Sequence, residues 1–69
     1  MPLTMANTGE TVLIKSIRGK DDTRRFLENL GFVAGSEVTV VSEMAGNLIV
    51  NIKEARVAIS KAMANRIMI

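Results

Sequence analysis

The chain contains neither cysteine nor histidine. Without cysteine there can be no disulfide bond, no thiolate nucleophile and no thiolate metal ligand. Without histidine the chain lacks the most frequent general base and the most frequent ligand for zinc, copper and haem iron. The sequence therefore predicts neither an enzyme nor a resident cofactor, although its carboxylates leave weak binding of a divalent metal chemically open.

Aromatic residues are almost as scarce, since they make up 3% of the chain and comprise only Phe26 and Phe32. Grooves that bind proline-rich peptides are lined by aromatic side chains, so this mode of peptide binding is excluded. Proteins that bind single-stranded nucleic acid combine aromatic stacking with a strongly basic groove. Because the net charge is only +2, no nucleic-acid partner is expected, and the mild surplus favours an acidic protein partner.

Long apolar runs are missing as well. No apolar stretch approaches the ~20 residues that span a bilayer, and the first ten residues do not combine a basic start with an apolar run. These features, together with the lack of cysteine, predict a soluble, cytoplasmic protein without membrane insertion.

What the chain does contain is enough apolar material for one core, because 48% of its residues are hydrophobic. A length of 69 residues allows a single domain, which we assign to residues 1–69. Leu3 and Met5 are expected to dock on the core from an irregular N-terminal segment. Residues 10–17 are rich in β-branched side chains and predict the first strand.

A short helix is predicted over residues 23–30. Asp21 or Asp22 can cap its first turn, and Gly31 follows its last turn, where a left-handed residue commonly ends a helix. The expected apolar stripe of this helix consists of Phe26, Leu27 and Leu30.

The remainder of the chain reads as short strands separated by turns. Gly46 and Asn47 both tolerate positive φ and predict a tight hairpin turn, and residues 61–65 predict a single helical turn. Further strands are expected at residues 38–41, 48–52, 55–60 and 66–69. The predicted fold is mainly β: a small SH3-like barrel of about five strands, with one short helix after strand one and a helical turn before the last strand.

Two runs of sequence resemble a known family when taken together. Residues 27–41 read LENLGFVAGSEVTVV, with a Leu-Gly pair, a second glycine four residues on and a valine-rich strand. Residues 56–69 read RVAISKAMANRIMI, a strand, a short alanine-containing turn and a final hydrophobic strand. In this order and separation they resemble FeoA proteins and the similar C-terminal domain of iron-dependent repressors.

The resemblance implies an accessory or regulatory protein of bacterial ferrous iron uptake. Its implied partner is FeoB, the ferrous iron permease that carries a GTPase domain, and its implied fold is SH3-like. Domains of this type are also described as binding transition metals, for which the sequence offers no recognisable ligand set.

The surface expected to bind such a partner combines arginine with exposed apolar residues of the glycine turn and the hairpin tip. Apolar side chains next to cations suit a protein interface that also has an electrostatic component. The predicted partner-binding residues are Arg24, Arg25, Phe32, Val33 and Met44.

Three matters stay open on the sequence alone. The chain could instead be a metal-responsive module or a nucleic-acid-binding small β-barrel, and it could form a homo-oligomer. Salt dependence of binding would separate a phosphate-binding protein from one with an apolar interface, since phosphate contacts weaken steeply with salt.

Overall fold

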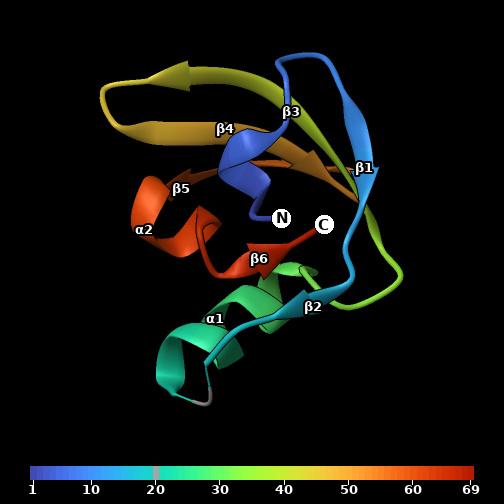
Figure 1. The fold of residues 1–69 in the computed structure, drawn as a ribbon, viewed down its shortest axis with the longest axis vertical. Helices are drawn as coiled ribbons and strands as arrows, with labels where there is room; N and C mark the ends of the chain where they lie inside the picture. The colour runs from blue at the N-terminus through green and yellow to red at the C-terminus, as the bar shows by residue number, and fades with distance from the viewer. Residues whose placement is uncertain (20) are drawn as a thin grey trace.

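The computed structural model describes residues 1–19 and 21–69 (Figure 1). Its strands form two antiparallel sheets, one with the order β1-β3-β4-β5 and one with the pair β2-β6. The elements in chain order are η1 (Leu3–Met5), β1 (Thr11–Leu13), β2 (Ser16–Ile17), α1 (Asp22–Leu30), β3 (Glu37–Met44), β4 (Asn47–Ile52), β5 (Ala55–Ser60), α2 (Lys61–Ala64) and β6 (Ile67–Met68). The mainly β, SH3-like prediction is confirmed, with the helix after the first strands and the helical turn before the last.

The segment predicted as one first strand is in fact two. Ile14 is buried where the chain leaves the larger sheet, and its N–H and C=O bond Ser36 and Gly35 in the loop before β3. The Lys15 N–H then donates to the Met68 carbonyl, which brings the chain into the smaller sheet. A strand that changes sheets at a corner serves both layers of a small barrel.

The β3–β4 hairpin turns one residue earlier than predicted. Ala45 and Gly46 have φ values of 52° and 81°, and Met44 pairs with Asn47 across them. Positive φ at both central residues is the pattern of a type I′ turn, whose twist matches that of the flanking strands. Asn47 is therefore the first residue of β4. The hairpin twists further at a bulge between Val40 and Ser42.

The N-terminal segment is ordered. Leu3 and Met5 were both predicted to dock on the core, and the prediction is right only for Leu3. Leu3 has no exposed surface, whereas Met5 is 64% exposed. Pro2 forms a bridge with Met68, and the Ile69 N–H donates to the Met1 carbonyl at 2.7 Å. The two chain ends therefore lie together beside β6 (Figure 1).

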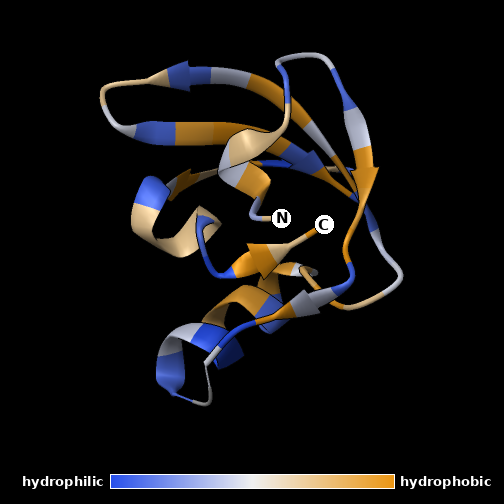
Figure 2. Ribbon diagram, viewed as in Figure 1, coloured by the Kyte–Doolittle hydropathy of each residue, from blue (hydrophilic) through white to orange (hydrophobic). Residues whose placement is uncertain are grey.

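The core is aliphatic apart from one phenylalanine. Hydrophilic residues gather around the start of α1 (Figure 2). The buried residues are Leu3, Ile14, Ile17, Leu27, Phe32, Val38, Val40, Leu48, Val50, Ile52, Ile59, Ala64 and Ile67. They come from every element except β1, whose Val12 is half-buried against the same cluster, so nearly every strand contributes to one shared core.

Candidate partner-binding surface

Helix α1 begins at a side-chain cap and ends at a glycine. The Asp21 carboxylate accepts from the Arg24 N–H, as expected for an N-cap. At the other end Gly31 has φ 110°, its N–H donates to Glu28, and the Phe32 N–H donates to Leu27. This pair of bonds is the Schellman motif, which is usually accompanied by an apolar contact between the residue after the glycine and the last full turn.

That motif explains why the prediction for Phe32 is wrong. Phe32 is not exposed at all; it belongs to the same buried cluster as Leu27. The left-handed glycine reverses the chain, so the following residue points back into the core instead of outward. Leu-x-x-x-Gly-Phe is the sequence signal for this contact.

The environment of Phe26 differs from the prediction in the opposite direction. It was expected on the apolar stripe of α1, yet it is 51% exposed, while Leu27 is buried and Leu30 half-buried. On a helix, Phe26 lies 100° from Leu27, so a stripe centred on Leu27 leaves it at the edge. Phe26 is a candidate contact that does not show in the sequence when all three residues are taken as one face.

The two predicted arginines are on α1 and reach solvent. Arg24 pairs with Glu28 at 3.8 Å and donates to the Gly19 carbonyl at 3.1 Å. Arg25 has 81% of its side chain exposed and lies 3.8 Å from Asp22. Exposed pairs of this kind contribute little stability, so both guanidinium groups can exchange their partners at small cost.

Val33 and Met44 lie in different parts of the molecule. Val33 is 37% exposed in the turn after α1, and Met44 is 67% exposed at the end of β3. The β3–β4 hairpin and α1 lie at opposite ends of the molecule (Figure 1). Arg24, Arg25, Phe26 and Val33 all lie on α1 or the turn that follows it, and we call these four residues the α1 surface, whereas Met44 lies apart.

An ion pair fixes the start of α1 to the C-terminal segment. Arg66 Nη1 lies 2.6 Å from Asp21 Oδ1, and the Arg18 N–H donates to the Arg66 carbonyl. The hydrogen bond from Arg66, aided by the Arg24 N–H, lowers the pKa of the Asp21 carboxyl although the group is exposed. The α1 surface is thus attached at its N-terminal end by contacts distant in sequence.

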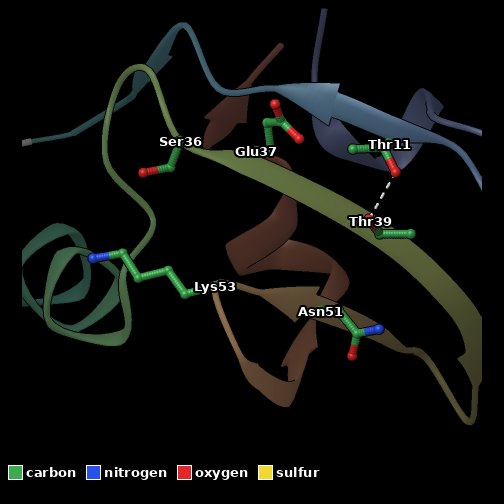
Figure 3. Close-up of a pocket in the computed structure, with 6 residues that line it drawn as sticks. All are labelled: Thr11, Ser36, Glu37, Thr39, Asn51 and Lys53. Atoms are coloured by element: carbon green, nitrogen blue, oxygen red, sulfur yellow. Dashed lines mark hydrogen bonds between the residues drawn. The ribbon is translucent and has the colours of Figure 1, made fainter.

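The outer face of the larger sheet carries an open polar depression of about 440 Å³. Figure 3 shows the threonine pair at one side, with hydroxyl oxygens 2.8 Å apart, and Lys53 extending away at the other. An alanine Cβ at Gly31 would lie 3.4 Å from Lys53 Cε, so the lysine stem crosses the end of α1. The lining residues are Thr11, Ser36, Glu37, Thr39, Asn51 and Lys53. The side-chain hydrogen bond that joins two of these six residues is the one between the threonines.

The described residues also offer no cluster for a metal. Among residues 1–19 and 21–69, no group of three or more histidine, cysteine, aspartate or glutamate side chains could hold an ion. A zinc site of the usual kind needs nitrogen or sulfur ligands that the sequence lacks. Within the same residues, no helix is long and apolar enough to cross a membrane.

The fold and these surfaces define a small SH3-like β domain that presents exposed side chains on a short helix. The family model for the FeoA domain matches residues 1–69. The chain therefore belongs to the FeoA domain family, which is associated with ferrous iron transport and is not an enzyme family.

Known relatives agree with this assignment. A protein of Methanocaldococcus jannaschii that carries the provisional name Fe(2+) transport protein A is 31% identical over 68 residues, covering 99% of this chain and 83% of that protein. The crystal structure of an iron uptake regulatory protein, FeoA, has a TM-score of 0.89 at 26% identity, covering 99% and 92% of the two chains. Stenotrophomonas maltophilia FeoA complexed with zinc, described as a prokaryotic SH3 domain protein, has a TM-score of 0.87 at 27% identity, covering 99% and 87%.

The same fold occurs inside a larger protein. A manganese-dependent transcriptional repressor has a TM-score of 0.86 at 26% identity, and the match covers 97% of this chain but 39% of the repressor. The expected similarity to a repressor domain is therefore present at the level of structure.

Proposed function

We propose that this chain is a cytoplasmic accessory protein of bacterial ferrous iron uptake that acts by binding a FeoB-type permease with a GTPase domain. Membership of the FeoA domain family supports the iron-transport role. The S. maltophilia relative is described as a candidate ferrous iron transport activating factor, which is in keeping with this role.

The observation that carries the proposal is the exposure of Phe26. A phenylalanine that leaves half its surface in water forgoes roughly 1 kcal/mol of the free energy that full burial would provide. Aromatic and arginine side chains are the residue types most enriched at the energetic centres of protein interfaces. Phe26 and Arg25 are consecutive in α1, about 100° apart around the helix axis, and both are largely exposed, so a partner that covers the solvent side of α1 can reach both types.

The surface also has suitable electrostatics for a negatively charged partner. Arg24 and Arg25 contact acids of their own helix at 3.8 Å, which is too long for a strong, fixed pair. An acidic group of the permease can therefore replace Glu28 or Asp22 as the partner of either arginine. Such pairs mainly raise the association rate and fix orientation, while the apolar centre supplies affinity.

The test is a binding titration against the soluble GTPase domain and against the full-length permease in detergent, with nucleotide state and salt varied. We expect Phe26→Ala to weaken binding about 10-fold or more and Arg24→Ala or Arg25→Ala to weaken it less, with the arginine effects shrinking at high salt. Met5→Ala is the matched control, because Met5 is 64% exposed on η1.

Met44→Ala tests the hairpin tip separately, since it changes the other exposed apolar residue of the expected site. Loss of binding in Met44→Ala alone would place the contact at the β3–β4 turn. If Phe26→Ala, Arg24→Ala and Arg25→Ala all bound like the wild type, the α1 surface would not be the contact.

A further inference from the structure

Strand β5 has one open edge. The larger sheet has the order β1-β3-β4-β5, so β5 pairs with β4 on one side, and among the described residues no strand pairs with it on the other. The opposite edge, β1, is only three residues long, whereas β5 has six residues and pairs with β4 without any register shift. Open edges present unpaired backbone groups that can accept another strand.

The register of β5 against β4 identifies which backbone N–H and C=O groups of β5 do not bond β4. Ile52 and Ala55 close the two-residue turn between β4 and β5, so they form a hydrogen-bonded pair, and such pairs alternate with non-bonded ones along the ladder. Val57 and Ile59 therefore bond β4. Arg56 and Ala58 turn their N–H and C=O groups away from β4 and toward solvent.

Most of the usual protections of an edge are missing from β5, although exposed Arg56 places one charge on the strand. The strand has no proline and no bulge, and its two inward residues, Val57 and Ile59, are apolar instead of charged. Helix α2 follows β5 directly and contacts β5 as well as β4 and η1, but it leaves Arg56 and Ala58 exposed. Ala58, at the middle of the free edge, is exposed and small, so another backbone can approach it closely.

We propose that the free edge of β5 pairs antiparallel with the same edge of a second copy of this chain, joining two four-stranded sheets into one. A twofold axis at Ala58 makes Ala58 its own partner and sets Arg56 opposite Ser60 of the other copy. Half-buried Val57 then lies beside the other copy's Ile59, which extends the apolar inner face of the sheet.

The charges of β5 fit this arrangement. Its first end carries Glu54 and Arg56, and its last end carries Lys61, which forms an ion pair with Glu43 at 2.5 Å. Antiparallel pairing brings these two ends together, each with one acid and one base, and no arginine faces an arginine. Since closed, self-complementary contacts are the commonest kind in homo-oligomers, a second copy is the occupant that this symmetry favours.

The dimer is expected to be weak, because one strand pair buries far less than the ~1,200 Å² of a stable interface. Sedimentation equilibrium of the wild-type chain over about 10 μM to 1 mM covers the range of weak association. We expect the average mass to rise toward that of a dimer. Ala58→Lys places two like charges at the axis and should keep the mass monomeric, whereas Ala34→Lys, at an exposed residue of the turn before β3, should associate like the wild type.

Amide hydrogen exchange locates the contact independently. Exchange of the Arg56 and Ala58 N–H groups should slow as the concentration rises, while the Val57 and Ile59 N–H groups, already bonded to β4, should not change. The same exchange experiment checks that the Ala58→Lys chain keeps a native-like spectrum. A wild-type chain that stays monomeric to about 1 mM, or an Ala58→Lys chain that associates equally well, would overturn the proposal.

Discussion

Phe26 and Phe32 are the two aromatic residues of the chain, and their environments are opposite. Phe32 has no exposed surface, whereas Phe26 is 51% exposed on a helix only nine residues long. The difference follows from the left-handed Gly31 between them, which turns the chain after α1 back toward the core. Phe32 therefore contributes to stability, and Phe26 is left available for the partner contact that we propose.

Substituting each phenylalanine by alanine should separate these roles. Phe32→Ala leaves a cavity in a well-packed core and should lower the free energy of unfolding by about 3–5 kcal/mol. This is a large part of the roughly 3–10 kcal/mol expected for a domain of this size. Phe26→Ala should lower it by about 1 kcal/mol or less, since much of the ring is already in water.

Urea unfolding followed by circular dichroism measures both changes. Equal destabilisation by the two substitutions would mean that Phe26 is a core residue in solution, and the α1 surface would then lose its apolar centre. A folded Phe26→Ala chain is also what makes the binding titration interpretable.

At the scale of single elements, α1 shows how a short helix is held in place. Nine residues are too few for a stable isolated helix in water, so its ends and its one buried stripe must supply the stability. The N-terminal end has the Asp21 cap and the Arg66 ion pair, and the C-terminal end has the Schellman motif around Gly31. The cap residue thus serves both local and long-range structure.

The Asp21 carboxylate should make the stability of the fold depend on pH. Its pKa is lowered in the folded chain by the hydrogen bond from Arg66, so the unfolded chain binds the proton more readily. The stabilisation is therefore fully present above the ordinary aspartate pKa of about 3.9 and is lost as the pH falls through the lowered value. Asp21→Asn keeps a capping oxygen but removes the charge, so we expect it to be less stable than the wild type at pH 7 and closer to it at pH 3.

Urea titrations at the two pH values test this expectation. Asp22→Asn is the control, because the Asp22 side chain is fully exposed and lies 3.8 Å from Arg25, so its removal should change stability little. The difference in the free energy of unfolding between Asp21→Asn and the wild type could also be the same at pH 3 and pH 7. In that case the ion pair between Asp21 and Arg66 would contribute nothing to stability.

At the scale of the whole molecule, the two sheets depend on segments that cross between them. The chain passes from one sheet to the other at Ile14, and the first residues pair with the last ones beside β6. Leu3 from η1 is fully buried in the common core, although η1 is not part of either sheet. The short 3-10 turn therefore closes the core at a place that no strand covers.

Leu3→Ala should consequently destabilise the entire domain, by about 2–5 kcal/mol, because it empties a fully buried site. Met5→Ala, in the same 3-10 turn, should change the free energy of unfolding by no more than about 0.5 kcal/mol, since Met5 is 64% exposed. Thermal unfolding of the two variants distinguishes the effects. If Leu3→Ala unfolded at the wild-type temperature, η1 would be an independent segment and not part of the core.

The sequence by itself determined those features that depend on neighbouring residues. A carboxylate cap at Asp21 or Asp22, the left-handed Gly31, the turn between β4 and β5 and the strand over Ala55–Ser60 follow from local rules of capping, turn geometry and alternation, and the β3–β4 turn was predicted to within one residue. The missing cysteine and histidine excluded thiol and imidazole chemistry without any structure. The order and spacing of these elements were sufficient to predict the SH3-like fold and to reveal the resemblance to FeoA proteins.

Only the tertiary structure decided which apolar side chains face water. Residues 10–17 divide between two sheets because Ile14 bonds a loop more than 20 residues away, which no local pattern encodes. Phe26 and Phe32 exchange their expected environments, and Met44 lies far from the arginines, because burial and proximity depend on how distant segments pack. The free edge of β5 is likewise a property of strand order in the assembled sheet, since every strand has the same backbone groups until its neighbours are placed.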